Sequence, residues 1–369
     1  MSMPVLPKVP EPLVCPLCER SLTVLVVNPA GELIGCEECA RARGLEHDTL
    51  TIQEWYAVDV VEEVLRQYGL SGRIGKPDAT STMPPRAHYW EITTPTGRYF
   101  LKRFANWYSP DAICHMHSVI SHLAASGVPV PRWVPVPFTG ESFVKGSNGE
   151  HWALYEALDG YILGQQEWMW TRPKAAEMLG HMHNALQGFV PQGEECASWQ
   201  AWTLETVDAV LDSWHTISSE FSPELLGIVR ERLATRYFGE LYPELPKHVI
   251  HGDFVLSNVL WQKEPMGPRV SGVLDFERTH MDAAIFDFAW GLGDRRPPLL
   301  RATLSTYARV HPLLPVEREA LPEALLLAAL MDIDLQLAYF HNMAEATRLA
   351  QELGYLVRDL DALRRAAGA

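Results

Sequence analysis

Two carboxylates and one amide flank a short apolar hairpin in the second half of the chain. The stretch VIHGDFVLSNVLW (249–261) places Asp253 after a strand-like run and Asn258 a short interval later, and RVSGVLDFE (269–277) supplies Asp275. Magnesium prefers oxygen ligands and usually takes one or two carboxylates together with phosphates. A carboxylate that holds no metal can instead accept a proton from an attacking hydroxyl. The three side chains are therefore candidates for a site of phosphoryl transfer.

A predicted hairpin would bring these residues together. Pro265, Gly267 and Pro268 mark a turn between two apolar strands, with Asn258 and Asp275 at similar distances on either side. Because the turn fixes the register of antiparallel pairing, both side chains should return to the same end. We therefore expect them to converge with the carboxylate that lies one loop earlier. The interval from that carboxylate to the amide also matches the catalytic loop of protein kinases.

The motifs HGDFVLSN (251–258), VLDFE (273–277) and DAAIFDFAW (282–290) together resemble the aminoglycoside phosphotransferase/choline kinase family of small-molecule kinases. The resemblance implies an α+β, bilobal, protein-kinase-like fold, with a β-rich N-lobe and a mainly helical C-lobe. It also implies that ATP and magnesium are required.

The resemblance assigns a role to each polar residue of these motifs. Asp253 would be the catalytic base, while Asn258 and Asp275 would hold magnesium. His251 and Asp287 would support the catalytic loop.

The first half of the chain supplies a lysine on a strand. RYFLKRF (98–104) places Lys102 on the same strand face as Phe100 and Phe104. The resemblance assigns Lys102 to the α- and β-phosphates of ATP. The helix expected at 111–127 carries an acid only at its start, so we expect this lysine to be anchored differently, or less firmly, than by the helix glutamate that is common in the family.

Two further features bear on nucleotide binding. The segment ALYEALDGY (153–161) resembles the hinge between the lobes, where backbone groups of Glu156 and Leu158 would bond adenine and Tyr155 would be the gatekeeper. The segment 76–90, which would cover the phosphates, contains no glycine.

Four of the six cysteines form two CxxC pairs, Cys15 with Cys18 and Cys36 with Cys39. Their spacing is typical of a four-cysteine zinc ribbon, in which each pair presents two thiolates to one ion. A β-hairpin around NPAG would bring the pairs together. Four thiolates fill a tetrahedral zinc, so the interpretation is a structural Zn2+ or a module that docks a protein partner.

Hydrophobic periodicity organises the rest of the chain. It predicts a helix at 51–70, a β-hairpin around PTG, and helices at 173–189, 203–217, 223–240, 298–310 and 317–365. The expected domains are an N-terminal arm and zinc-ribbon module (1–45), an N-lobe with a leading helix (46–158) and a helical C-lobe (159–369).

Composition limits the function classes. The chain has 369 residues and a net charge of -15, which disfavours binding to nucleic acid. No secretory signal precedes the cysteines, and the apolar segment 321–340 is interrupted by two aspartates, so we expect a cytoplasmic protein with no membrane span. The prediction is a kinase for a small hydroxyl compound, such as an aminoglycoside, choline, homoserine or a sugar. The alternative is a kinase-like pseudoenzyme that binds a protein through its zinc ribbon.

Overall fold

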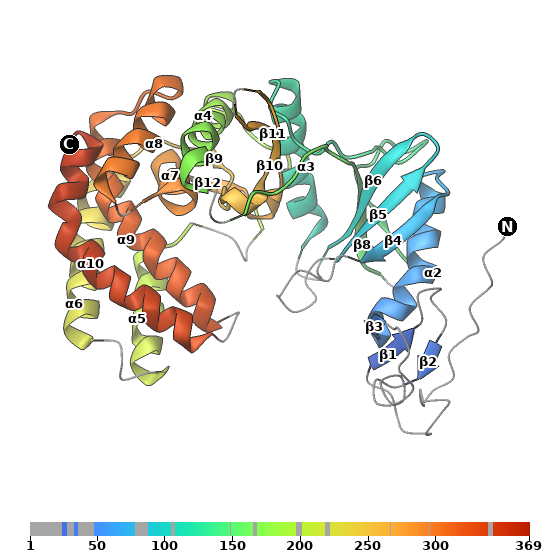
Figure 1. Cartoon of the computed structure of the whole chain (residues 1–369), viewed down its shortest axis with the longest axis horizontal. Coiled ribbons are helices and arrows are strands. Elements are labelled where there is room, and N and C mark those ends of the chain that lie inside the picture. Colours follow the sequence, from blue (N-terminus) through green and yellow to red (C-terminus); the bar gives the residue numbers. More distant parts are fainter. Residues whose placement is uncertain are drawn as a thin grey trace.

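A computed structural model shows the chain as a strand-rich lobe and a mainly helical lobe, with a short β-hairpin lying between them (Figure 1). The described residues are 24–27, 33–35, 48–77, 88–104, 108–147, 149–164, 168–196, 201–217, 222–265, 267–294, 296–338 and 342–369. The four cysteines of the predicted zinc ribbon lie outside these ranges.

A small antiparallel sheet precedes the N-lobe. It contains β1 (Val24–Val27), β2 (Leu33–Gly35) and β3 (Asp48–Thr51) in the order β2-β1-β3. The pairing of β1 with β2 is the hairpin predicted between the two CxxC pairs. The third strand was not predicted: the sequence assigned no element to 48–50 and placed Thr51 at the start of a helix.

The N-lobe is built on a five-stranded antiparallel sheet of order β4-β5-β6-β8-β7. Its strands are β4 (Arg73–Pro77), β5 (His88–Thr94), β6 (Gly97–Arg103), β7 (Val144–Lys145) and β8 (His151–Glu156). The predicted hairpin around PTG is the β5–β6 pair, and the predicted helices are α2 (Ile52–Gln67) and α3 (Pro110–Ala125).

The two faces of this sheet belong to different hydrophobic cores, as strand alternation requires. On β8, Trp152 and Leu154 pack with the apolar stripe of α2. Ala153 and Tyr155 point the other way and pack with α3 and the main core of the C-lobe. The face that carries Ala153 is therefore the one that meets the second lobe.

The C-lobe is mainly helical, as predicted. Its helices are α4 (Trp168–Leu186), α5 (Leu204–Ile217), α6 (Pro223–Arg232), the π-helix η3 (Leu233–Leu241), η4 (Tyr242–Glu244), α7 (Ala284–Leu292), α8 (Pro297–Val310), α9 (Pro315–Ala338) and α10 (Met343–Ala367). Two short strand pairs lie among them, β9 (Lys247–Ile250) with β12 (His280–Ala283) and β10 (Val259–Gln262) with β11 (Arg269–Val273).

Two helix boundaries differ from the prediction. Helix α4 begins at Trp168, so Pro173 lies inside the helix and does not start it. The predicted helical stretch 317–365 is two helices, because the side chain of Asn342 caps a new N-terminus by accepting a hydrogen bond from the N–H of Glu345 at 3.2 Å.

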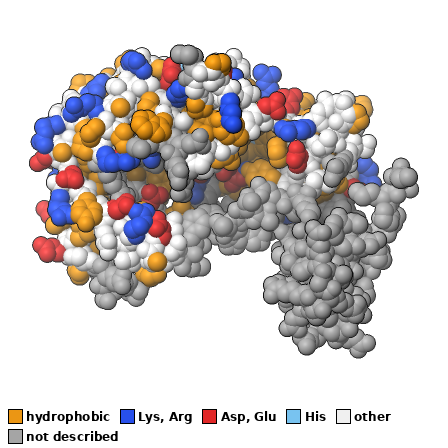
Figure 2. All heavy atoms as spheres, viewed as in Figure 1, with side chains coloured by type: hydrophobic (Ala, Val, Ile, Leu, Met, Phe, Trp, Pro, Cys, Tyr) orange, Lys and Arg blue, Asp and Glu red, His pale blue; other side chains and the backbone are white. Residues whose placement is uncertain are grey.

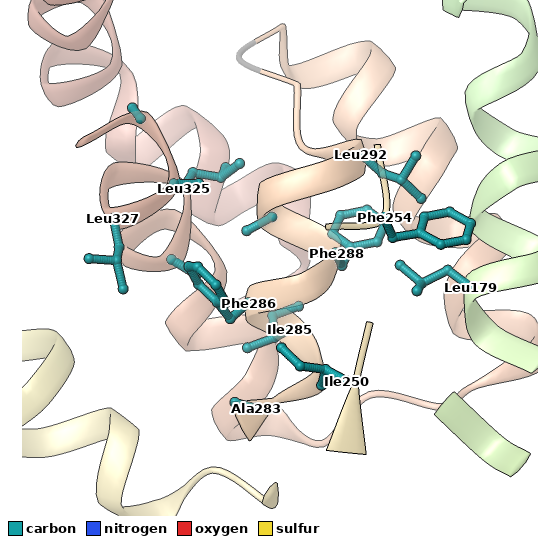
Figure 3. Packing of buried hydrophobic residues seen from close by; sticks show 14 of the residues in the cluster. Leu179, Ile250, Phe254, Ala283, Ile285, Phe286, Phe288, Leu292, Leu325 and Leu327 are labelled. Atoms are coloured by element: carbon teal, nitrogen blue, oxygen red, sulfur yellow. The ribbon is translucent and has the colours of Figure 1, made fainter. Parts of the chain in front are cut away.

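The core of the C-lobe holds the loop after β9 in place. Phe254 points between α4 and α7 and packs near Leu179, Phe288 and Leu292 (Figure 3). Helix α7 comes so close to this loop that a Cβ on Gly291 would lie 1.8 Å from the carbonyl oxygen of Phe254. Only glycine permits this approach.

Charged side chains are mixed over the described surface. On the face shown in Figure 2, Lys and Arg are interspersed with Asp and Glu and form no single basic patch. Among the helices that the structure describes, none has the length and apolar character needed to cross a bilayer.

Candidate active site

The β10–β11 hairpin has the predicted geometry. Val259 pairs with Val273, and the N–H of Leu274 donates to the carbonyl of Asn258 at 2.8 Å. Asn258 immediately precedes β10, and Asp275 follows β11 by one residue. The hairpin therefore returns the amide and the carboxylate to the same end, between the lobes (Figure 1).

Asp253 lies beside Asn258 in the loop between β9 and β10. The amide nitrogen of Asn258 donates to the carbonyl oxygen of Asp253 at 2.9 Å and to its carboxylate at 3.3 Å. Because the amide nitrogen is used in this way, the oxygen of Asn258 is the atom available to a metal. The indole of Trp290 donates to the other carboxylate oxygen of Asp253 at 3.1 Å, and the guanidinium of Arg278 lies 3.8 Å from it.

Burial raises the pKa of the Asp253 carboxyl. The positive charge of Arg278 opposes this shift, and the negative charge of Asp275 adds to it. The geometric link between Asp253 and Asp275 runs through Asn258, whose side-chain amide contacts Asp253 and whose backbone carbonyl accepts the N–H of Leu274 next to Asp275.

Asp275 has the features of an oxygen ligand. Its backbone is left-handed, with φ of 64°, an uncommon conformation for a residue other than glycine. Its Oδ1 atom is buried and has no hydrogen-bond partner among the described residues, and Lys102 Nζ lies 3.9 Å away. A buried carboxylate oxygen without a donor fits a bound cation, so Asn258 and Asp275 fit magnesium.

Asp287 anchors the loop that carries His251, Gly252 and Asp253. Its carboxylate accepts hydrogen bonds from the backbone N–H of His251 at 2.8 Å and of Gly252 at 3.1 Å, and it lies 3.1 Å from His183 Nε2. Burial alone would raise the pKa of Asp287, but the hydrogen bond and charge of His183, together with His251, hold it below its usual value. The side chain is fully buried, so these contacts are shielded from water.

His251 joins the catalytic loop to the end of β11. Its Nε2–H donates to the carbonyl of Leu274 at 3.0 Å, while its Nδ1 accepts the N–H of Asp253 at 3.2 Å. Gly252 has φ of 74°, and a Cβ there would lie 2.2 Å from the carbonyl oxygen of Arg278. The HGD motif thus has a structural reason at each of its three positions.

Lys102 is buried on β6, opposite Tyr89 of β5. Its ammonium lies 4.9 Å from the ring centre of Tyr89 and 5.3 Å from that of Phe104, and it forms an ion pair with Glu277. Burial lowers the pKa of Lys102 to about 8, and the charge of Asp275 opposes that shift.

The predicted hinge residues lie at the end of β8. Tyr155 is buried, and its hydroxyl lies 2.7 Å from His117 Nε2 on α3. The N–H of Glu156 donates to the carbonyl of Arg132 at 2.8 Å, and the N–H of Ala157 donates to the carbonyl of Arg98 at 3.0 Å. Leu158 follows directly in the segment that leads to the C-lobe.

Sequence reasoning missed three residues that contact the predicted ones. Trp290 and Arg278 touch Asp253, and Glu277 touches Lys102. Glu277 and Arg278 directly follow the DF pair that was identified, so their position was a usable signal. Trp290 closes the DAAIFDFAW motif, but nothing in its spacing showed that its indole would reach the catalytic loop.

Comparison with known proteins identifies the family of the chain. Residues 87–322 match the model of the phosphotransferase enzyme family (APH). The homoserine kinase of Methylobacillus flagellatus is 28% identical over 251 residues, covering 65% of this chain and 72% of that protein, and the Caulobacter vibrioides homoserine kinase is 25% identical over 240 residues, covering 63% and 72%. The microcompartment-associated aminopropanol kinase superposes with a TM-score of 0.61 at 15% identity, covering 83% of this chain and 98% of that one. The chain therefore belongs to the phosphotransferase enzyme family, and it is a small-molecule kinase that transfers a phosphoryl group to a hydroxyl.

Proposed function

We propose that the protein uses ATP and magnesium to phosphorylate the hydroxyl of a small amino alcohol or hydroxy amino acid such as homoserine. One observation carries this proposal. Asp253, Asn258 and Asp275 converge at one end of the hairpin, with Lys102 ion-paired across the site from the other lobe.

Each residue then has a defined part in the transfer. Asp253 accepts the proton of the acceptor hydroxyl as its oxygen attacks the γ-phosphorus and ADP leaves. Lys102 offsets negative charge on the phosphates. Asn258 and Asp275 would hold magnesium, which supplies charge neutralisation at the phosphates when bound. His251 and Asp287 keep the loop in place through the backbone contacts described above.

The hinge is the proposed adenine site. The carbonyl of Glu156 and the N–H of Leu158 would pair with the edge of the base, and the buried Tyr155 would form the back wall. This assignment is supported by the position of these residues at the end of β8, which pairs with β6, the strand of Lys102.

The charge beside the base restricts the acceptor. The reacting hydroxyl must reach Asp253, so the acceptor lies within a few ångströms of the Arg278 guanidinium, which is 14% exposed. The guanidinium can pair with a carboxylate on the acceptor, and the neighbouring Asp253 and Asp275 carboxylates can accept an ammonium group. The matches to homoserine kinases favour the same kind of acceptor.

The test is an ATP-consumption assay with a panel of acceptors. We expect the fastest turnover with homoserine or a related small amino alcohol or hydroxy amino acid, and slower turnover with aminoglycosides. Asp253→Asn should abolish turnover and retain ATP binding in calorimetry. Turnover that survives this substitution would remove Asp253 from the mechanism, and ATP binding without turnover of any acceptor by the wild type would favour the pseudoenzyme.

The N-terminal module (1–45) is a separate proposal. We infer that Cys15, Cys18, Cys36 and Cys39 hold a structural zinc ion and that the module contacts a protein partner. The hairpin of β1 and β2 between the two CxxC pairs supports the zinc assignment. Metal analysis of purified protein tests it, with one zinc per chain expected and its loss in Cys15→Ser.

A further inference from the structure

Lys102 needs a negative partner because its ammonium is almost fully shielded from water. Helix α3 packs beside it but supplies no carboxylate to it. On α3, His117 packs edge-on against Phe104, the ring that also contacts the Lys102 ammonium, and burial together with the charge of Lys102 lowers the pKa of His117 to about 3. His117 is therefore neutral, and its Nε2 already faces the hydroxyl of Tyr155.

The partner comes instead from the segment after β11. Glu277 lies in η6 (Phe276–Arg278), directly beyond Asp275. One of its carboxylate oxygens pairs with Lys102, and the other accepts a hydrogen bond from the hydroxyl of Tyr108 at 2.7 Å. Both oxygens are thus engaged, and the side chain is only 18% exposed.

We propose that Glu277 is the positioning residue for Lys102 and that Tyr108 orients Glu277. This inference rests on the proposed function, because the purpose of fixing Lys102 is to hold its charge at the phosphates of ATP. The segment 275–278 then fixes two things: the position of Lys102, through Glu277, and the position of the proposed metal ligand Asp275. The placement of Lys102 depends on η6 of the C-lobe and not on helix α3.

The distances around Lys102 predict what it would do without Glu277. Asp275 is the nearest remaining carboxylate, with its Oδ1 at 3.9 Å from Lys102 Nζ. After Glu277→Gln, Lys102 would move toward Asp275 and compete with the metal for that oxygen. Both the KM for ATP and the magnesium concentration needed for half-maximal rate should rise. The loss in kcat/KM for ATP should be on the order of 100-fold, the effect of a displaced reacting group.

A double-mutant cycle separates this role from direct metal binding by Glu277. The cycle combines Glu277→Gln with Lys102→Met and measures kcat/KM for ATP. If Glu277 acts through Lys102, Glu277→Gln should lower kcat/KM by less than about 3-fold in a protein that already carries Lys102→Met. Independent losses that multiply would overturn the proposal, because they would mean that Glu277 acts without the lysine.

Three further variants control for structural damage. Glu277→Asp should recover part of the lost activity, and Tyr108→Phe should lose about 5-fold. Glu150→Gln removes the partner of Arg103, the next residue on the same strand, and should leave the kinetics unchanged. Equal losses in Glu150→Gln and Glu277→Gln would point to a general disturbance of β6.

The same cycle is measured by thermal unfolding and by metal-free ATP binding, neither of which requires turnover. A wild type that transfers no phosphate would refute the proposed function alone. Additive effects of the two substitutions on both unfolding and ATP binding would refute the pairing.

Discussion

The substitution Asp287→Asn tests the support of the catalytic loop. The carboxylate accepts two backbone hydrogen bonds, from His251 and Gly252, and contacts His183. Asparagine keeps one oxygen acceptor but turns an NH2 group toward the second backbone N–H. One hydrogen bond is lost and a buried backbone N–H is left unpaired. The remaining hydrogen bonds then have a neutral acceptor in place of a charged one, and the three effects together cost about 4 kcal/mol of unfolding free energy.

This loss can be converted into measurable quantities. For a chain of 369 residues, about 4 kcal/mol corresponds to a decrease in Tm of roughly 5 °C. Because Asp253 follows the two anchored residues directly, the base should also shift, and kcat should fall by about 100-fold for a displacement near 1 Å. The assays are differential scanning fluorimetry and ATP consumption at saturating substrate.

Glu323→Gln is the matched control. Glu323 is also fully buried, and its carboxylate accepts hydrogen bonds from Arg232 and Arg364 away from the catalytic loop. This variant should lose a similar amount of stability and keep its kcat at 25 °C. The reasoning fails if Asp287→Asn retains wild-type kcat, or if both variants lose activity in proportion to their loss of stability.

Two other predictions follow from close packing and from buried histidines. Gly291→Ala should lower kcat at least 10-fold because its Cβ would displace Phe254. Gly227→Ala, whose Cβ meets nothing within 4 Å, should leave kcat unchanged. Equal kcat values for the two variants would contradict the close approach of α7 to the backbone of Phe254. Burial, together with the neighbouring histidines, lowers the pKa of His311 to about 4. The unfolded chain therefore binds this proton first, near pH 6.5, and the stability from neutral His311 is lost as pH falls from about 6.5 to 4. Between pH 7 and 5, protonation of His311 should contribute about 2 kcal/mol to the decrease in unfolding free energy. His311→Gln should remove this contribution, whereas the control His181→Gln, at an exposed site, should keep it. An unchanged pH dependence of stability in His311→Gln would refute this reasoning.

The motifs of the catalytic loop could be identified from the sequence because their geometry is local. A turn fixes the register of the hairpin that follows it, so the return of Asn258 and Asp275 to one end was predictable and is confirmed by the pairing of Val259 with Val273. The alternation around Lys102 likewise predicted an aromatic environment. Phe104 is part of it, while Tyr89 comes from the neighbouring strand.

Helix boundaries were less predictable. Pro173 was expected to start a helix because proline is common at the first helical position. The structure places the start at Trp168, since packing of a helix can override a single local preference. The boundary of a helix depends both on the residue types at its end and on tertiary contacts, and the contacts cannot be read from the sequence.

The sequence by itself determined the motifs whose residues we propose carry the chemistry and, through strand and turn periodicity, how the hairpin presents them. Only the tertiary structure decided what surrounds them: Glu277 against Lys102, and Trp290 and Arg278 against Asp253. The physical reason is sequence separation. Lys102 and Glu277 meet because two lobes pack together, and a buried charge takes whichever opposite charge the packed fold brings within reach.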